Sequence, residues 1–525
     1  MVLAEVTLVK AVRPTPIRMI TMREAGADLL TAGRSSMEYR AMHHTIRFSI
    51  VAGVTAATAI ALLTACGSDK GTGPEPLGTP VVTQVNGVTE PTGLIGMTVI
   101  IEGASLGDSA RGKVYFLGAG GTRLQAPAAR ADWASTFIIA TVPTGTADSS
   151  KVWVETTGGV SDSIPFTLIS GGTFSPSNIT WSTASALPQP LQGLGALSIK
   201  VGRGSTQQSW VYTVGGADAS NVASSALFGA QVMTNGSLGS WSAMTSQPTA
   251  RAYHALVAAT PSTARIDTTV SGYIYALGGI DATGATVGTV EFTQVGLDGA
   301  LSAWQSTTPL PTALHNAGAV VFRGFLYVAG GANGSNQPTA SAYRAEVHAD
   351  GTLGSWQSVG SLPNPTAYHS MVSFGPYVYV VGGDNGTVAP SLATVSGTET
   401  NTAYVGRIDM RTGALPSWTA VTSMGKARSK GAVVAAGGAL LATSGLYAGQ
   451  AGSSENTYAS IGAEGALASW NGATGSNTID VVLGYALYNT AAVFFVDAQG
   501  GGHIMVIGGA SRSATPQPSA GVVYY

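Results

Sequence analysis

Six polar side chains lie close to short apolar runs in the C-terminal two thirds of the chain. They are Arg251, His254, His315, His369, Arg428 and Lys430. His254 and His369 hold the same place in two similar segments, TARAYHALV and PTAYHSMV, and Arg251 and Arg428 share a place three residues before it. Arginine recognises carboxylates through two parallel N–H donors, and histidine exchanges protons near neutral pH. The set predicts a polar binding pocket, although a residue that recurs in a repeat can equally serve the structure of each repeat.

Patterns for catalysis and metal binding are otherwise weak. The segment Gly103-Ala-Ser105-Leu-Gly107 matches the serine-hydrolase elbow, but that elbow joins a strand to a helix, and here a turn and another strand follow. The chain has no His-x-x-x-His pair, and Asp384-Asn385-Gly386 is too short for a calcium loop, so Asp384 is interpreted as a turn former. The sequence predicts no catalytic residue, no metal and no cofactor.

A repeated phrase that ends in tryptophan indicates which elements position these residues. Its copies are TNGSLGSW, LDGALSAW, ADGTLGSW, RTGALPSW and AEGALASW, which end at Trp241, Trp304, Trp356, Trp418 and Trp470. Each copy has a glycine five residues and a leucine three residues before the tryptophan. Trp181 precedes the five copies and lacks this glycine and leucine. A recurring spacing of 52 to 63 residues is typical of a repeat architecture.

Within each repeat the order of signals is constant. A polar stretch with Leu-Pro precedes a small apolar run, then a strand that ends on two glycines, then a strand centred on an aromatic residue, and finally the tryptophan phrase. In the fifth repeat Ser444-Gly445 replaces the diglycine and Met424-Gly425 replaces Leu-Pro. Four short strands per repeat, bounded by Gly, Pro, Asn or Asp, predict an all-β fold. Six such units around an axis form a β-propeller, which hides nearly all of its sheet edges.

The diglycine, the tyrosine before it and the trailing tryptophan resemble the kelch repeat, over about two thirds of the chain. The resemblance implies a six-bladed kelch-type propeller over residues 178–525, with the tryptophans wedged between successive sheets. The final GVVYY matches a third strand, and the segment 178–182 around Trp181 supplies the missing fourth strand. We therefore expect the first and last strands to share a sheet. We also expect inner strands to face the central channel, so that the six polar residues converge near its mouth.

A second module precedes the propeller. Residues 79–169 contain about seven short alternating strands with turn signals between them, which predicts an Ig-like β-sandwich. The segments GMTVIIEG from Gly96, 133–143 and 152–159 resemble the IPT/TIG domain in their order. Residues 170–177, rich in Gly and Ser, are interpreted as the linker to the propeller.

The N-terminal residues are typical of an export signal. From Met42 a basic start leads into an apolar run, 48–65, that ends on Leu63-Thr-Ala-Cys66. This arrangement predicts a signal peptide over residues 42–66 and resembles the bacterial lipoprotein box, in which the cysteine is lipidated. Cys66 is the sole cysteine of the chain, and Gly67 after it favours, by analogy, the outer membrane or cell surface. An uncleaved membrane span is the alternative. Residues 1–41 are an extension or a misassigned start, and 67–78 form a flexible tether.

Composition limits the function classes. Charged residues make up 10% of the chain and the net charge is −2, which gives no electrostatic footprint for nucleic acid.

We expect a lipid-anchored envelope protein whose propeller binds a glycan or a protein without catalysis. A structural envelope protein without a soluble ligand is one alternative. A sugar-acting enzyme resembling the six-bladed kelch family that isomerises sialic acid is another, and it needs a carboxylate-binding arginine, such as Arg251, and an acidic partner in the channel. Galactose-oxidase-like copper chemistry is excluded, because it needs a cysteine in the propeller.

Overall fold

The structure is a computed structural model of the whole chain. It describes residues 4–11, 41–48, 78–86, 91–93, 95–128, 130–168, 180–203, 207–261, 263–264, 266–267, 269–387, 389, 396–447, 455–472, 487–498, 501–511 and 520–524. The chain divides into two units, Met1–Glu75 and Pro76–Tyr525. In the first unit, β1 (Ala4–Ala11) pairs antiparallel with β2 (Ala41–Phe48). Most of the predicted signal peptide, Cys66, most of the tether and the predicted linker lie outside the described residues.

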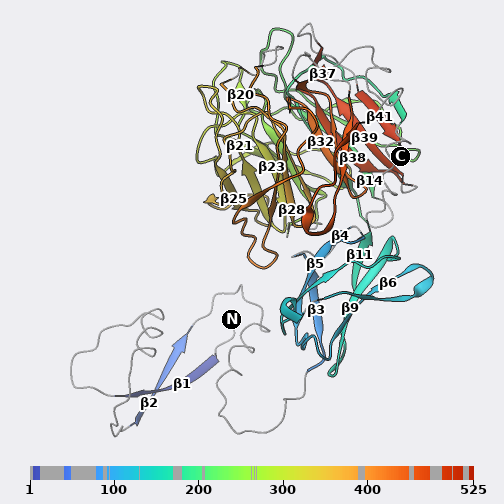
Figure 1. The fold of residues 1–525 in the computed structure, drawn as a ribbon. Coiled ribbons are helices and arrows are strands. Elements are labelled where there is room, and N and C mark those ends of the chain that lie inside the picture. The colour runs from blue at the N-terminus through green and yellow to red at the C-terminus, as the bar shows by residue number, and fades with distance from the viewer. Residues whose placement is uncertain are drawn as a thin grey trace. The chain divides into compact units, whose positions relative to one another are not determined.

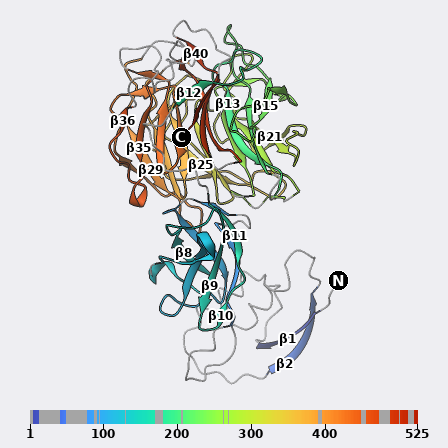
Figure 2. The ribbon, with the colours of Figure 1, turned by 90° about the vertical axis from the view of Figure 1, so that its right-hand side faces the viewer.

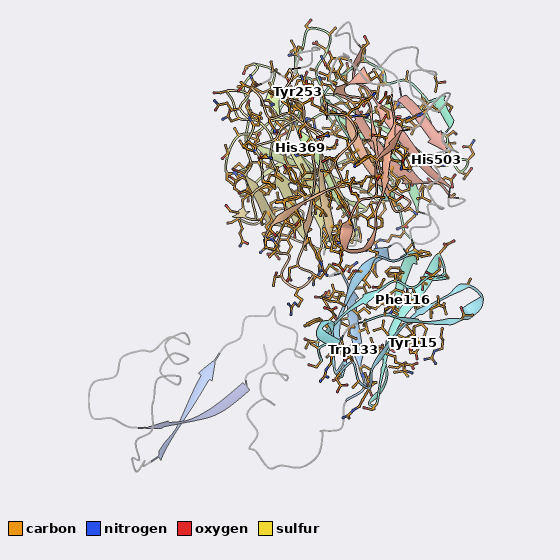
Figure 3. All side chains as sticks on the ribbon, in the orientation of Figure 1. Tyr115, Phe116, Trp133, Tyr253, His369 and His503 are labelled. Carbon is orange, nitrogen blue, oxygen red and sulfur yellow. The ribbon has the colours of Figure 1, made fainter. Side chains whose placement is uncertain are left out.

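Residues 78–168 form a β-sandwich (Figure 1). One sheet holds β3 (Val81–Val85), β5 (Thr98–Ala104) and β8 (Phe137–Thr141). The other holds β4 (Thr92–Gly93), β11 (Ile164–Leu168), β9 (Ser149–Thr156), β6 (Lys113–Leu117) and β7 (Arg123–Ala126), with β10 (Gly159–Val160) beside β9. Apolar residues alternate along the strands, so that Phe116, Val154 and Phe166 are fully buried between the sheets. Figure 3 shows Phe116 inside this domain. The segment after Ser105 leads into β6 and not into a helix, which removes the serine-hydrolase interpretation.

Residues 180–524 form a six-bladed propeller of four-stranded antiparallel sheets (Figures 1 and 2). From the inner strand outward, blade 1 has β13 (Gly195–Val201), β14 (Gln208–Val214), β15 (Leu227–Gln231) and β16 (Ser242–Ala243). Blade 2 has β18 (Ala255–Ala259), β19 (Gly272–Leu277), β21 (Val290–Val295) and β22 (Gln305–Thr307). Blade 3 has β23 (Gly318–Phe322), β24 (Phe325–Ala329), β25 (Ala342–Glu346) and β26 (Gln357–Ser358).

Blade 4 has β27 (Ser370–Phe374), β28 (Tyr377–Val381), β29 (Ala403–Arg407) and β30 (Trp418–Val421). Blade 5 has β32 (Ala432–Ala436), β33 (Ala439–Thr443), β35 (Thr457–Ser460) and β36 (Asn471–Gly472). Blade 6 has β38 (Ala491–Val496), β39 (Gly502–Ile507), β41 (Ala520–Tyr524) and β12 (Thr180–Thr183). The pairing of β12 with β41 confirms that the first and last strands of the propeller share a sheet. No helix among the described residues is long and apolar enough to cross a membrane.

The repeated tryptophans join neighbouring blades. Each indole N–H donates to the main-chain oxygen of the residue four positions after the tryptophan of the preceding blade, at 2.7–3.1 Å. The pairs are Trp241 with Ser185, Trp304 with Thr245, Trp356 with Thr308, Trp418 with Gly360 and Trp470 with Thr422. Trp304 and Trp418 are 8% exposed. The tryptophans therefore lie between the sheets, as the sequence predicts.

A hydrogen bond and a close steric contact explain why each tryptophan phrase contains a glycine. The tyrosine of the second strand donates its hydroxyl to the main-chain oxygen of this glycine in the next blade, at 2.7–2.9 Å. The pairs are Tyr212 with Gly299, Tyr275 with Gly351, Tyr327 with Gly413 and Tyr379 with Gly465. The aromatic ring two residues before each tyrosine lies where a Cβ on the glycine would be, at 2.5–2.8 Å. Only glycine fits this contact.

The diglycines carry a second set of bonds between blades. The N–H of the second glycine donates to a main-chain oxygen of the next blade at 2.7–2.9 Å, and the six bonds form a closed circle. The acceptors, in blade order from blade 2, are Arg251, Leu314, Thr366, Arg428, Leu487 and Leu191. The first glycine has φ between 60° and 66° in five blades. Ser444 takes the same left-handed conformation in blade 5, with φ 54°.

Candidate functional site

A closed ring of main-chain hydrogen bonds surrounds the channel where the inner strands begin. One residue per blade takes part, and its N–H donates to the carbonyl oxygen of the matching residue in the preceding blade at 2.7–3.2 Å. These residues, here called the mouth ring, are Gly193, Tyr253, Asn316, Tyr368, Lys430 and Asn489. All six have φ between 50° and 58°.

The mouth ring stores conformational strain. Glycine and asparagine adopt the left-handed conformation readily, but for Tyr253, Tyr368 and Lys430 it costs about 1–2 kcal/mol each. Strain of this kind persists only where the surrounding structure imposes it, and it gathers at functional sites. The closed hydrogen-bonded ring imposes it here. The ring therefore holds five non-glycine side chains in fixed positions at one mouth of the channel.

A cavity of about 260 Å³ lies at the mouth ring, on the channel axis. All six blades contribute to its lining, each with its ring residue and the three or four residues that follow. Main chain and small side chains make up much of the surface, among them Gly195, Ala255, Gly318 and Ala432. Aspartate and glutamate are absent from the described lining, and Lys430 is its one lysine or arginine.

The prediction that Arg251 and Arg428 reach the channel mouth is wrong. Arg251 is fully buried in blade 2, where its guanidinium forms an ion pair with Glu291 at 2.9 Å and donates to the carbonyl oxygen of Gly278 at 2.9 Å. Arg428 donates to the carbonyl oxygens of Ser444 and Glu455, at 3.1 Å each. Both arginines tie the diglycine turn to the segment before the third strand of their own blade.

His254 and His369 line the cavity, but their rings lie between blades. A Cβ on Gly195 would meet Nε2 of His254 at 2.9 Å, and one on Gly318 would meet Nε2 of His369 at the same distance. Each histidine thus fills the space that a glycine leaves on the preceding inner strand. The imidazole of His254 has no hydrogen-bond partner among the described residues, while that of His369 interacts with the main chain of Ala329 and Thr366. Burial lowers the pKa of His254 to about 3 and that of His369 to about 4, so both rings are neutral at physiological pH.

His315 and Lys430 meet at Tyr368. The ring of His315 packs edge-on against Tyr368 at 6.1 Å between centroids, and the Lys430 ammonium lies 5.0 Å from the centre of the same ring. His315 is 1% exposed, is absent from the lining of the cavity, and burial lowers its pKa to about 4. Burial also lowers the pKa of Lys430 to about 8, while nearby Asp384 and Glu399 oppose that shift. Of the six predicted residues, the structure brings His254, His369 and Lys430 to the cavity.

Sequence reasoning missed the loop that carries Asp384 and Glu399. Asp384 is buried and accepts the hydroxyls of Ser396 and Thr398 at 2.6 Å each, which closes the base of the loop. Repeat spacing would have revealed it. In blades 1, 2, 3 and 6 the third strand begins eleven residues after the second glycine, but in blade 4 it begins twenty residues after Gly383. Insertions into a regular repeat often mark its binding face.

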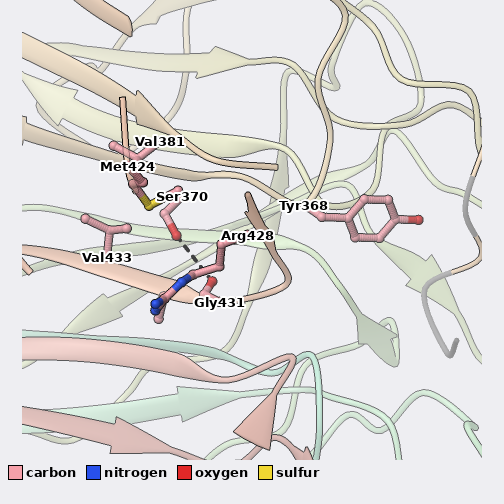
Figure 4. A pocket seen from close by; sticks show the side chains of 8 residues that line it. Tyr368, Ser370, Val381, Met424, Arg428, Gly431 and Val433 are labelled. Carbon is pink, nitrogen blue, oxygen red and sulfur yellow. Dashed lines mark hydrogen bonds between the residues drawn. The ribbon is translucent and has the colours of Figure 1, made fainter. Parts of the chain in front are cut away.

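The sequence also gave no indication of Tyr253, Asn316, Tyr368 and Asn489 as mouth residues. They stand beside the predicted histidines in AYH, HNA and AYH, and Asn489 occupies the matching place in blade 6. Figure 3 shows Tyr253 and His369 within the propeller. In Figure 4, Tyr368 points away from Arg428 across a small pocket of about 10 Å³, where Ser370 donates to the carbonyl oxygen of Gly431. That pocket has room for about one water molecule.

Comparison with known proteins shows similarity to parts of the chain. No protein-family model matches the chain. Ninety-four residues, 18% of this chain, are 35% identical to Kelch-like protein 34 of Homo sapiens, and they span 14% of that relative's length. A solved structure titled "Structure of YjhT" aligns with 64% of this chain and 95% of its own, at a TM-score of 0.44 and 13% identity. The six four-stranded blades, the diglycines and the curated relative support one conclusion: residues 180–524 form a kelch-type β-propeller.

Proposed function

We propose that this protein is exported, anchored to the cell envelope or surface through a lipid on Cys66, and binds a glycan at the mouth ring without catalysis. The anchor rests on the lipoprotein-like sequence before Cys66. The binding role rests on the mouth ring, which is described in the structure. A lipid-tethered propeller presents such a ring to ligands outside the cell.

The mouth ring is the observation that carries the binding role. It combines two tyrosines, two asparagines and a lysine around one cavity, all fixed by main-chain bonds. Tyr253 donates its hydroxyl to Asn221 at 2.8 Å, and Asn489 donates its amide to Gln192 at 3.1 Å, so these side chains are held in place. Asparagine both donates and accepts hydrogen bonds, and its remaining groups can serve a ligand. Ligands rich in hydroxyl groups suit such a set. A purely structural envelope protein would gain nothing from holding Tyr253, Tyr368 and Lys430 in a strained conformation at the mouth.

The internal ion pair of blade 2 supports binding over catalysis. A sugar-acting enzyme of the kind considered above needs an arginine and a carboxylate in the channel. Here Arg251 pairs with Glu291, and their side chains are 0% and 5% exposed. Each charge is satisfied by the other inside the sheet, so neither is available to a ligand in the cavity.

A glycan array tests the proposal. The full chain should bind at least one glycan, and Lys430→Gln should weaken that binding by about tenfold because Lys430 belongs to the ring. Lys200→Gln is the matched control, since Lys200 is exposed near the far end of inner strand β13. Binding to no glycan, or equal loss in both variants, would refute a glycan site at the ring. Binding to proteins alone would favour a protein ligand.

A further inference from the structure

We propose that the cavity behind the mouth ring receives one neutral sugar ring, the terminal residue of a glycan. This inference rests on the proposed glycan binding and sharpens it in two respects. The proposed ligand is the terminal sugar of the glycan and not an internal sugar unit. It is also an uncharged sugar and not an acidic one. The cavity is called the cup below, and its lining is the set of ring residues and following residues described above.

The depth of the cup limits the ligand to one unit. Its lining reaches only the second or third residue of each inner strand, for example Ala196 in β13, Ala319 in β23 and Ala492 in β38. The remaining residues of these strands, such as Ile199 and Ala258, are outside the lining. A volume of about 260 Å³ is just below the range of about 300–1,000 Å³ that is usual for drug-sized ligands. Such a cup has room for one sugar ring, and an internal residue would need an exit for the chain on both sides.

The chemistry of the lining suits hydroxyl groups. In the described sheets each inner strand pairs only with the second strand of its blade, so its other edge faces the channel. An edge strand presents unpaired N–H and C=O groups, and six edges therefore surround the cup with alternating donors and acceptors. A hydroxyl group donates once and accepts twice, and can match both. The rings of His254 and His369 lie between blades, so the strand edges and not the imidazole nitrogens supply these hydrogen-bonding groups to the cup.

The charges at the rim favour a neutral ligand. Lys430 is the one cationic side chain of the described lining, and it is 4% exposed. Its ammonium group donates to the carbonyl oxygen of Ala389 at 3.0 Å and lies 5.0 Å from the centre of the Tyr368 ring. The one cation of the described lining is therefore already bound within the protein. A sugar carboxylate would enter the cup without an arginine or an uncompensated lysine to offset the loss of its hydration.

The test measures binding of methyl glycosides to the full chain by calorimetry. The probes are the methyl glycosides of glucose, galactose, mannose and N-acetylglucosamine, with those of glucuronic acid and sialic acid as the charged comparison. A cup-filling variant, Ala319→Leu, is compared with Ala258→Leu, because both alanines are half-buried on inner strands and only Ala319 lines the cup. The thermal midpoint of both variants checks that the propeller remains folded.

We expect at least one neutral glycoside to bind, to lose about tenfold or more in affinity in Ala319→Leu, and to change by less than about twofold in Ala258→Leu. Preference for an acidic glycoside, or equal affinity in the two variants, would overturn the inference. If Ala319→Leu does not fold, Ala492→Leu replaces it on β38. Array glycans that bind while no methyl glycoside does would leave the proposed function standing and remove the terminal-sugar inference. Absence of both kinds of binding would remove the two together.

Discussion

The hydroxyl of Tyr275 donates to the main-chain oxygen of Gly351 at 2.7 Å, across the boundary between blades 2 and 3. The same bond recurs at four boundaries, from blade 1 to blade 5. Blade 5 has Leu441 and blade 6 has Met505 at the position of the tyrosine. Blade 6, built from both ends of the propeller, therefore lacks this bond on either side.

Tyr275→Phe tests the strength of this bond. Both groups are buried, so the variant leaves the Gly351 oxygen without its donor, and the free energy of unfolding should fall by about 1–3 kcal/mol. Denaturant unfolding measures the change. Leu441→Phe is the matched control, since it occupies the same place in a blade that never had the hydroxyl. An unchanged midpoint in Tyr275→Phe would show that the bond adds nothing to stability.

Trp304→Ala should destabilise the propeller by about 3–5 kcal/mol, as large aromatic truncations in a core do. Its indole is 8% exposed and bonds to Thr245 of the preceding blade. Trp304→Phe keeps an aromatic ring between the blades and loses only the indole hydrogen bond, so the free energy of unfolding should fall by less. A loss below about 1 kcal/mol in Trp304→Ala would contradict the wedge and return the tryptophans to the candidates for ligand binding.

Gly330→Ala separates close packing from left-handed strain. An added Cβ would lie 2.5 Å from the Thr366 oxygen of the next blade, at a φ of 64°. Gly284→Ala is the control, because its φ of 84° is also left-handed but no atom lies within 4 Å of the added Cβ. The control should lose about 1–2 kcal/mol and Gly330→Ala about 1–3 kcal/mol more. Equal losses in denaturant unfolding would mean that the blades separate enough to admit the methyl group.

Stability should fall as the solution becomes acidic. The pKa values of His254, His369 and His315 are about 3, 4 and 4 in the folded protein, below about 6.5 in an unfolded chain. The unfolded state therefore takes up protons first. Stability from these groups is complete above pH 6.5 and is lost as the pH falls toward 4, at up to about 1.4 kcal/mol per pH unit for each histidine.

The His254→Leu/His369→Leu double variant should flatten this dependence between pH 7 and pH 5. Leucine already holds the matching position in blade 1, as Leu194. His348→Leu is the control, since His348 is exposed. Unfolding free energies at several pH values provide the measurement. A double variant with the full slope would show that these imidazoles do not set the acid sensitivity.

Cys66→Ser should abolish lipidation. The segment Leu63-Thr-Ala-Cys66 motivates this prediction, which concerns residues outside those that the structure describes. The wild-type chain should incorporate a palmitate analogue and fractionate with membranes, and the serine variant should do neither. Labelling that persists in Cys66→Ser would contradict an anchor at this residue.

Repetition explains which features the sequence predicted. A diglycine or a Gly-x-Leu-x-x-Trp phrase that recurs in register fixes the blades, and Trp181 with the final strand fixes their closure. The positions of the arginines could not be predicted in this way. The place of Arg251 before an inner strand predicts a side chain in the channel, but that side chain lies within the blade beside Glu291. What faces the axis is the edge of each strand, so main chain lines the channel where side chains were expected.

The mouth ring escaped prediction for a different reason. Residue preferences indicate a left-handed conformation at Gly193, Asn316 and Asn489, but they oppose it at Tyr253, Tyr368 and Lys430. The ring is imposed by bonds between blades, which single segments do not reveal. The nine extra residues between Gly383 and Ala403 were visible in the sequence, and comparing each repeat with the others would have identified that loop.

The closure of the mouth ring has a consequence for how the chain is made. Gly193 donates its N–H to the oxygen of Asn489, and Ser198 bonds to Phe494, 296 residues later. The two bonds at Asn489 that complete the circle cannot form while the ribosome still holds the last blade, and β12 has no partner until β41 emerges. The two ends of the propeller therefore stay unjoined until the whole chain has been synthesised.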